Sequence, residues 1–156
     1  MSDPAPAPPV AAPESFRDDP RVGLIAESFV RLLGRPLVAA GDMPVADRLW
    51  AAPLAIVAHG TEADPLFFFG NRAALLRFET GLERFVGMPS RLSAEAPLRE
   101  ERQALLERVT RHGFIDDYAG IRISARGTRF PIRDAVVWNL LDTEGRRHGQ
   151  AAAFAV

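Results

Sequence analysis

The spacing of apolar residues changes from a helical to a strand pattern about one third of the way along the chain. Within residues 15–33, four apolar residues recur at intervals of three and four positions: Val22, Ile25, Phe29 and Leu32. This spacing predicts an amphipathic helix whose apolar stripe either packs against the rest of the domain or contacts a second copy of the chain. A second, short helix is expected to begin near Asp42 and to run to Trp50.

From residue 53 onward the pattern predicts two strands, two short helices, one long helix and three further strands. The expected ranges are 53–59 and 65–69 for the first strands, 72–79 and 83–86 for the short helices, 98–112 for the long helix, and 118–124, 130–141 and 150–156 for the last strands. Short glycine-containing turns join the last three strands, so these strands are expected to be antiparallel. This order predicts an α+β domain with an antiparallel five-stranded sheet, flanking helices and an N-terminal amphipathic helix.

Alternation along the last strands predicts which side chains share a face of the sheet. One face of the strand at 130–141 is expected to carry Phe130, Ile132, Val136, Trp138 and Leu140. Asp134 falls in the same register, so it either lies at a bulge or is buried beside a partner such as an arginine. On the preceding strand, Asp116, Tyr118 and Arg122 can share a face, either as a polar patch at the mouth of a cup or as solvated outer surface.

Composition sets broad limits on organisation and partners. The 156 residues, 47% hydrophobic and 25% charged, suffice for one domain with a buried core. We divide the chain into a disordered Pro/Ala-rich tail (1–14), a helical extension (15–50) and the main domain (51–156). The net charge of −1 gives no electrostatic reason to expect nucleic acid or an anionic membrane as a partner.

The chain contains no cysteine, which excludes disulfides, thiolate metal sites, cysteine nucleophiles and a covalent cysteinyl–flavin adduct. The lack of cysteine also fits the reducing cytoplasm, where we expect the protein to reside. The N-terminus shows no secretory signal, and no apolar run approaches the about 20 residues that a membrane-spanning helix needs.

Several segments between residues 50 and 155 share the pattern of a known module. They are 59–65 (HGTEADP), 71–74 (NRAA), 90–91 (SR), 99–102 (REER), 113–118 (GFIDDY), 120–124 (GIRIS), 138–139 (WN) and 149–151 (GQA). In these segments the chain resembles the MEKHLA domain family, a PAS-like module of plant homeodomain-leucine zipper transcription factors and of stand-alone bacterial proteins. The resemblance implies a PAS-like cup between a sheet and its helices. The hexapeptide that names the family is absent and no homeodomain or zipper precedes the module, so transcription-factor function is not expected to carry over.

The wider resemblance to PAS domains raises haem, flavins and small acids as ligands, and the fold alone does not choose among them. Residues 87–93 resemble the segment in which light-sensing flavin domains carry a reactive cysteine before an arginine. Ser90 and Arg91 occupy these positions, and a serine hydroxyl does not form the flavin adduct, so only non-covalent flavin stays open. His112 lies on the helix that carries the axial histidine in PAS haem sensors, although its position also suits the negative end of a helix dipole. Gln150 lies on the closing strand, where flavin-binding PAS domains use a glutamine.

Polar residues in the segments that would form the cup are candidates for ligand contacts. His59, Glu62 and Asp64 could contact a ligand or metal, or they could form a structural turn; their spacing matches no recognised metal motif, so no metal is assigned. Asn71 is also suited to cap the helix at 72–79. The candidate ligand-binding residues are His59, Glu62, Asp64, Asn71, Ser90, Arg91, Tyr118, Arg122, Trp138, Asn139 and Gln150.

The sequence therefore predicts a PAS-like sensory, ligand-binding or protein-interaction module with a regulatory role and no catalytic residues. Its expected partners are an unidentified small molecule in the cup and a second copy of the chain, with no nucleic acid and no membrane. As an interaction module, the flat face of its sheet would pair with another protein or with that second copy. The alternative is a small enzyme built on an α+β cup, with a buried carboxylate, Asp116 or Asp134, as its acid or base.

Overall fold

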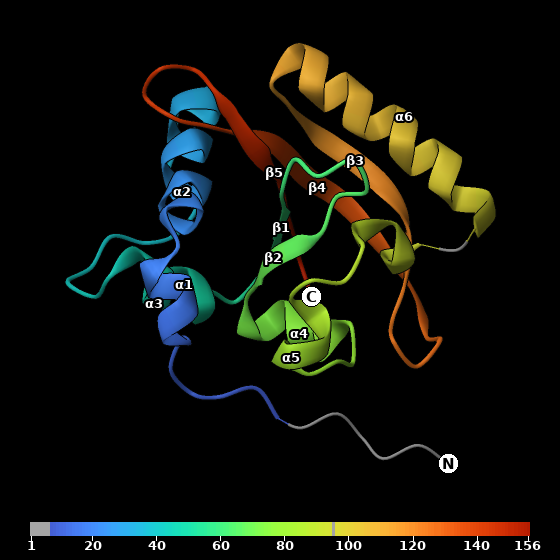
Figure 1. The fold of residues 1–156 in the computed structure, drawn as a ribbon, viewed down its shortest axis with the longest axis horizontal. Helices are drawn as coiled ribbons and strands as arrows, with labels where there is room; N and C mark the ends of the chain where they lie inside the picture. The colour runs from blue at the N-terminus through green and yellow to red at the C-terminus, as the bar shows by residue number, and fades with distance from the viewer. Residues whose placement is uncertain (1–6, 95) are drawn as a thin grey trace.

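A five-stranded antiparallel sheet organises the computed structural model, which describes residues 7–94 and 96–156 (Figure 1). Its strands are β1 (Ala55–His59), β2 (Phe67–Gly70), β3 (Phe114–Ile123), β4 (Arg129–Leu141) and β5 (Arg147–Phe154). The order across the sheet is β2-β1-β5-β4-β3, so the last strand of the chain pairs with the first. The predicted α+β class with an antiparallel five-stranded sheet and flanking helices is confirmed.

Helices cover both faces of this sheet. Before the sheet come α1 (Glu14–Asp18), α2 (Pro20–Leu33) and α3 (Val45–Trp50), and between β2 and β3 come α4 (Arg72–Arg77), α5 (Leu82–Phe85), the 3-10 helix η1 (Ser90–Ser93) and α6 (Ala96–His112). Figure 1 shows α2 and α6 on opposite sides of the sheet. We call the face under α2 the outer face and the face under α6 the inner face. The single helix predicted within 15–33 is in fact two, because Asp19 caps a new helix that starts at Pro20.

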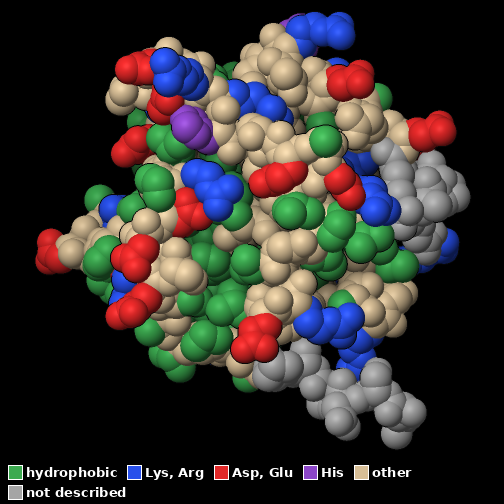
Figure 2. Space-filling model, in the orientation of Figure 1, with side chains coloured by type: hydrophobic (Ala, Val, Ile, Leu, Met, Phe, Trp, Pro, Cys, Tyr) green, Lys and Arg blue, Asp and Glu red, His purple; other side chains and the backbone are tan. Residues whose placement is uncertain are grey.

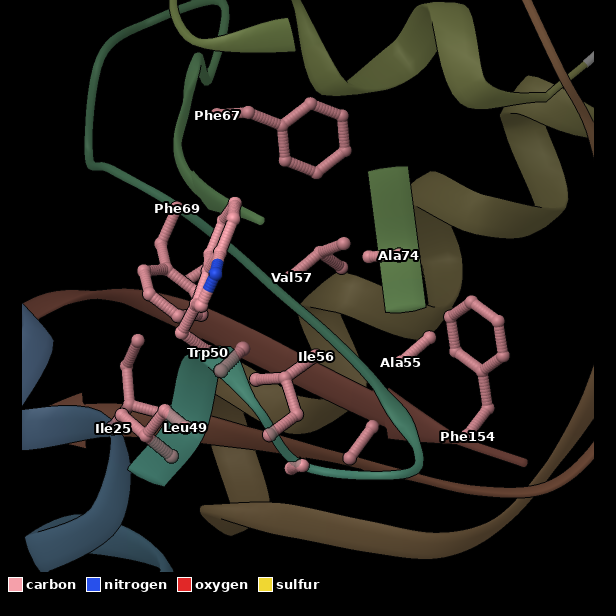
Figure 3. Packing of buried hydrophobic residues seen from close by; sticks show 14 of the residues in the cluster. Ile25, Leu49, Trp50, Ala55, Ile56, Val57, Phe67, Phe69, Ala74 and Phe154 are labelled. Atoms are coloured by element: carbon pink, nitrogen blue, oxygen red, sulfur yellow. The ribbon is translucent and has the colours of Figure 1, made fainter. Parts of the chain in front are cut away.

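The outer face is closed by the apolar stripe of α2. The Phe29 ring meets the Trp138 ring edge-on, with 4.9 Å between the ring centroids, and Trp138 Nε1 donates a hydrogen bond to the Ile25 carbonyl oxygen, 3.1 Å away. Figure 3 shows Ile25 of α2 with Leu49 and Trp50 of α3 in the same packed cluster. Since Phe29 is only 1% exposed, the stripe packs against the domain and is not available to a second copy. The flat sheet face that the interaction hypothesis required is covered.

A β-bulge on β4 decides which of its residues face inward. Tyr118 pairs with Ala135 and Gly120 with Ile132. Over this interval β4 therefore contains one residue more than β3, which is the definition of a β-bulge. Asp134 lies in the interval with a positive φ of 51°, a conformation that an L-residue adopts at a bulge but not in a regular strand. Of the two situations predicted for Asp134, the structure shows the bulge, and the side chain is exposed.

This bulge makes the predicted shared face of β4 wrong. Ile132 and Phe130 lie on the inner face, where Phe130 packs against Phe78 with 5.1 Å between ring centroids. Beyond the bulge the alternation is reversed, so Trp138 lies on the outer face and its neighbour Asn139 on the inner face. One inserted residue therefore assigns two segments of the same strand to opposite faces.

Part of the proline-rich segment that precedes α1 lies against α3. Residues 7–13 form no helix or strand, but Pro8 and Ala12 are buried, and Trp50 Nε1 donates a hydrogen bond to the Pro9 carbonyl oxygen, 3.1 Å away. The rest of the predicted tail, residues 1–6, lies outside the described residues. Residues 7–50, which comprise the end of this segment, α1, α2 and α3, thus build a cover for the outer face.

Charged side chains of both signs are interspersed over the face of the molecule seen in Figure 2, with hydrophobic side chains between them. A surface of mixed sign produces no extended field of one polarity on this side of the protein. None of the helices in the described part of the chain is long and apolar enough to cross a bilayer.

Candidate functional site

A small cavity lies between α6 and the inner face of the sheet, with a volume of about 50 Å³. Its apolar lining comes from the strands, from α6 and from the end of α4: Val57, Phe67, Phe78, Leu105, Ile132 and Phe154. A cavity of this size holds a few water molecules or a very small solute, because one water molecule needs at least about 10–15 Å³ of such space.

Polar side chains from five elements also line this cavity: His59 of β1, Ser93 of η1, Arg102 of α6, Tyr118 and Arg122 of β3, and Gln150 of β5. His59 and Gln150 are partners in the register of β1 and β5, so their side chains leave the sheet next to each other on one face. Arg122 Nη2 donates a hydrogen bond to the Tyr118 hydroxyl oxygen, 2.9 Å away. A largely apolar wall with a few converging polar groups is the usual composition of a small-molecule site.

His59 is buried as a neutral imidazole. Its pKa is lowered from 6.5 to about 4, mainly by burial and to a smaller extent by the charges of Arg102 and Arg147. Nδ1 lies 3.0 Å from the Gly60 carbonyl oxygen and must donate to it, so the proton sits on Nδ1. Nε2 is then a bare acceptor, and it has no hydrogen-bond partner among the described residues.

The two arginines of the cavity are electrostatically unusual. Arg102 is 7% exposed, and burial, together with the charge of Arg122, lowers its pKa to about 10, which still leaves it charged at neutral pH. Burial likewise lowers the pKa of Arg122. Within the described part of the chain, neither guanidinium forms an ion pair with a carboxylate. The cavity thus carries two positive charges that the protein does not balance locally.

Gln150 joins the cavity to α6. Its Nε2 lies within hydrogen-bonding distance of the Leu106 carbonyl oxygen (3.1 Å), Thr110 Oγ1 (2.9 Å) and Asn139 Oδ1 (3.0 Å). Asn139 Nδ2 in turn donates to the Val109 carbonyl oxygen, 3.0 Å away. The Oε1 of Gln150 is buried and has no partner among the described residues. Two adjacent amides therefore tie α6 to the sheet and leave one acceptor unused at the cavity.

Over residues 20–156 the sequence matches the MEKHLA domain. The chain belongs to the MEKHLA domain family. The match begins at the first residue of α2, so it includes α2 and α3 in addition to the segments on which the resemblance rested. No curated protein matches the chain significantly in sequence.

Solved PAS and light-oxygen-voltage structures share the fold of this MEKHLA domain. The PAS domain of a protein from Colwellia psychrerythraea is 13% identical with a TM-score of 0.58, covering 68% of this chain and 87% of that one. A cysteine-to-valine variant of the fungal photoreceptor VVD is 12% identical with a TM-score of 0.59, covering 85% and 93%. The light-state dimer of the fungal blue-light photoreceptor Vivid is 13% identical with a TM-score of 0.58, covering 85% and 93%. The MEKHLA domain is therefore PAS-like in fold, as predicted.

Three candidates from the sequence lie in the turn at 60–66 or contact it, away from the cavity. Glu62 Oε1 accepts a hydrogen bond from the Leu66 backbone N–H, 3.1 Å away, which closes the turn. Asp64 pairs with Arg91 at 3.2 Å, and both side chains are about half exposed. The described residues contain no cluster of three or more His, Cys, Asp or Glu suited to a metal ion. Glu62, Asp64 and Arg91 are thus placed as parts of a structural turn.

Three further candidates are buried but do not line the cavity. Asn71 has a structural role. Its side chain caps α4 at Ala74 and makes three more backbone hydrogen bonds, to Leu49, Leu54 and Ile56. Trp138 faces α2, because it lies beyond the bulge on the outer-face register of β4. Ser90 is fully buried at the start of η1, and its hydroxyl has no partner among the described residues.

The carboxylates proposed for an enzyme do not lie in the cavity. Asp134 is exposed at the bulge of β4. Asp116 is also exposed, because β3 carries a bulge of its own between Ile115 and Tyr118. This bulge separates Asp116 from Tyr118, which turns into the cavity. A mechanism that depends on burial of either carboxylate therefore has no basis in this structure.

Neither haem nor a flavin fits this cavity. Pockets for ligands of drug size measure about 300–1,000 Å³. The cavity here is about 50 Å³, and Phe67, Tyr118 and the two arginines occupy the space around it. His112, the candidate haem ligand, is exposed at the end of α6 and does not line the cavity. The residues present do not suit either cofactor.

Arg102 and Ser93 line the cavity but are not among the candidate residues predicted from the sequence. Within the described part of α6, Arg102 shares an inward stripe with Leu105 and Val109, at helical intervals of three and four. The signal was present in the sequence, since an arginine stands where the stripe requires an apolar side chain. A charged residue in the buried stripe of an amphipathic helix indicates a partner inside the fold.

Proposed function

We propose that this MEKHLA domain is a sensory module that binds a small molecule in the cavity between α6 and the sheet and transmits binding through α6. The observation that carries the proposal is the pair of buried acceptors without a partner, His59 Nε2 and Gln150 Oε1, on neighbouring strands of one cavity. A buried polar atom without a hydrogen bond costs about 1–3 kcal/mol. A ligand that supplies the missing donors would recover this free energy.

The hydrogen bonds of Gln150 supply a route from the cavity to the surface. Gln150 presents one side of its amide to the cavity and donates with the other side to Leu106 and Thr110 of α6. A ligand that reorients this amide changes the hydrogen bonds that hold the helix. In this proposal α6, which is exposed on its far side, is the output element, and its change in mobility is what a partner protein would read.

A regulatory, non-enzymatic role is part of the proposal. Ser93 lines the cavity, but its Oγ donates to the Ser90 carbonyl oxygen, 2.7 Å away, and not to His59. A serine nucleophile needs an adjacent base to take its proton, and this hydroxyl is turned to the backbone instead. The neutral His59 is therefore better explained as a ligand acceptor than as a catalytic base.

Self-association and a cytoplasmic location complete the proposal. A solved structure of Vivid is a light-state dimer, which supports dimer formation in a domain of this fold. Here such a dimer would use a surface other than the outer face of the sheet, because α2 covers that face. Light scattering of the purified protein gives the oligomeric state directly.

The sensory function is tested by amide hydrogen exchange in α6, measured with and without four small solutes: acetate, glycolate, glycolamide and ethylene glycol. Denaturation followed by mass spectrometry detects any molecule that co-purifies. We expect at least one bound molecule to slow exchange in α6, and the substitution Ala152→Leu to abolish this effect because Ala152 lines the cavity. The control is Ala155→Leu, at an exposed position. Unchanged exchange with every solute and no co-purifying molecule would contradict the proposal.

A further inference from the structure

The cavity concentrates positive charge in an apolar space. Arg102 is 7% exposed and forms no hydrogen bond or ion pair with any other described residue. Arg122 faces the same cavity, and its charge contributes to the lowered pKa of Arg102. Arg102 is buried and Arg122 is partly buried, and two such cations without a carboxylate partner are unfavourable unless an anion lies between them or beside them.

Nearby carboxylates do not supply that anion. Asp64 raises the pKa of Arg102 through its charge, but it is half exposed and pairs with Arg91 at 3.2 Å. Asp117, on the same strand as Tyr118, is exposed. The charge of the two cavity arginines is thus left for a molecule from solution.

Opposite this positive charge the cavity offers acceptors. His59 is neutral with its proton on Nδ1, so Nε2 presents a lone pair. The unused Oε1 of Gln150 presents another, next to His59 in the sheet register. An anion that has only acceptor atoms would leave both of these groups without a partner, whereas a hydroxyl group donates to either of them.

We infer that the cavity binds a small carboxylate that carries a hydroxyl group, with the carboxylate held by Arg102 and Arg122 and the hydroxyl held by His59 and Gln150. This names the ligand class of the site proposed above and rests on that proposal. A planar carboxylate presents two oxygens to the fork of a guanidinium. Inorganic phosphate also carries a P–OH donor at neutral pH, so the titration below compares it directly with glycolate. The volume of about 50 Å³ restricts the acid to a few heavy atoms, of which glycolate is a minimal example.

Calorimetric titration of the wild-type protein separates the two parts of the inference. Glycolate carries both groups, acetate lacks the hydroxyl, glycolamide lacks the charge, and inorganic phosphate replaces the carboxylate. We expect glycolate to bind about fivefold more tightly than acetate, because one buried hydrogen bond contributes about 1 kcal/mol. Glycolamide should bind about 100-fold more weakly than glycolate, since hydrogen bonds to charged groups contribute about 1.5–3 kcal/mol each.

Two arginine substitutions locate the binding site. Arg102→Gln and Arg122→Gln should each weaken glycolate binding by about 10-fold or more, the effect expected for one charged hydrogen bond. Arg111→Gln, on the exposed part of the same helix as Arg102, is the matched control and should leave the affinity unchanged. If one variant does not fold, the other variant and the wild-type comparison of glycolate with glycolamide still decide the result.

Each outcome of these titrations either supports or overturns the inference. Glycolate binding that needs both arginines supports the inference. Glycolamide binding as tightly as glycolate, or phosphate binding more tightly, overturns the ligand class and leaves the sensory proposal in place. The same holds if none of the solutes binds but a different molecule co-purifies in the cavity. No binding and no co-purifying molecule overturns the inference and the sensory proposal together.

Discussion

Trp138 and Asn139 are neighbours on β4, yet their side chains lie in two different environments. Trp138 faces outward, where its indole donates to the Ile25 carbonyl oxygen and packs on Phe29. Asn139 faces inward, beside Gln150, whose Oε1 has no partner. On the outer face, aromatic packing and satisfied hydrogen bonds stabilise the fold. On the inner face, Arg102 and Arg122 have no carboxylate partner and Gln150 Oε1 accepts no hydrogen bond from the described residues. We propose that the outer face stabilises the fold and that the inner face binds a ligand. Four substitutions or conditions test this division.

The largest effect is expected on the outer face. Phe29→Ala should lower the free energy of unfolding by about 3–4 kcal/mol, because it leaves a cavity against Trp138. Val30→Ala, the next residue in α2 and 47% exposed, is the control and should change it by less than about 0.5 kcal/mol. Urea unfolding measures both. Equal, small losses in the two variants would mean that α2 does not stabilise the sheet.

The second effect is a loss of stability in acid that originates from His59. Its pKa is about 4 in the folded protein against 6.5 ordinarily, so below pH 6.5 the unfolded chain takes up the proton first. The stability linked to the neutral imidazole is present above pH 6.5 and is lost as the pH falls towards 4. The loss attributable to His59 is about 2 kcal/mol at pH 5.

His59→Gln isolates this contribution, because the variant cannot take up the proton. Urea unfolding at pH 7.5 and pH 5 should show a larger loss in the wild type than in the variant. The same loss in both proteins would show that the imidazole is not held neutral by burial, and the acceptor assigned to Nε2 would be wrong.

The third substitution is expected to raise the stability of the protein instead of lowering it. Arg102→Met should raise the free energy of unfolding of the unliganded protein by about 1 kcal/mol, because it replaces a buried cation without a carboxylate partner by an apolar side chain. A purely structural arginine would instead destabilise the protein when removed. Arg111→Met, exposed on the same helix, is the control and should have no measurable effect. A clear loss of stability in Arg102→Met would contradict the division between the two faces.

The smallest effect concerns the bulge that assigns residues to faces. Asp134→Gly should raise stability by about 0.5 kcal/mol, since glycine adopts the positive φ of 51° without strain. Arg133→Gly, exposed in the preceding position, should lower stability by about 0.5–1 kcal/mol, as expected for glycine at a strand position without a positive φ. If both changes destabilise equally, Asp134 is not the strained residue of the bulge.

The order of elements could be predicted from sequence because periodicity and turn residues are local signals. The stripe at Ile25 and Phe29 predicts α2, and the end of α6 is marked by Gly113, whose φ of 93° suits glycine. The break between α1 and α2 was missed, although Asp19 followed by Pro20 is a helix start. Such a signal is overlooked when the apolar stripe continues across it.

The composition of the cavity could not be predicted in the same way, because it depends on two bulges. A bulge shifts alternation by one residue, and the sequence around Asp134 contains no glycine that would mark it. Trp138 was therefore predicted on the wrong face. Tyr118, Arg122 and Gln150 were predicted as site residues and do line the cavity. Arg102 could have been predicted as well, because a cation that interrupts the apolar stripe of a helix is visible in the sequence.

The most direct test of the account is a two-dimensional ¹H–¹⁵N NMR spectrum of the wild-type protein titrated with glycolate. The side-chain amide of Gln150 and the Nε–H of Arg102 report on the inner face, and the indole N–H groups of Trp50 and Trp138 report on the outer face. We predict that glycolate shifts the Gln150 and Arg102 signals and leaves both indole signals in place. Indole signals that move as much, or Gln150 and Arg102 signals that stay fixed at saturation, would contradict a binding site confined to the inner face.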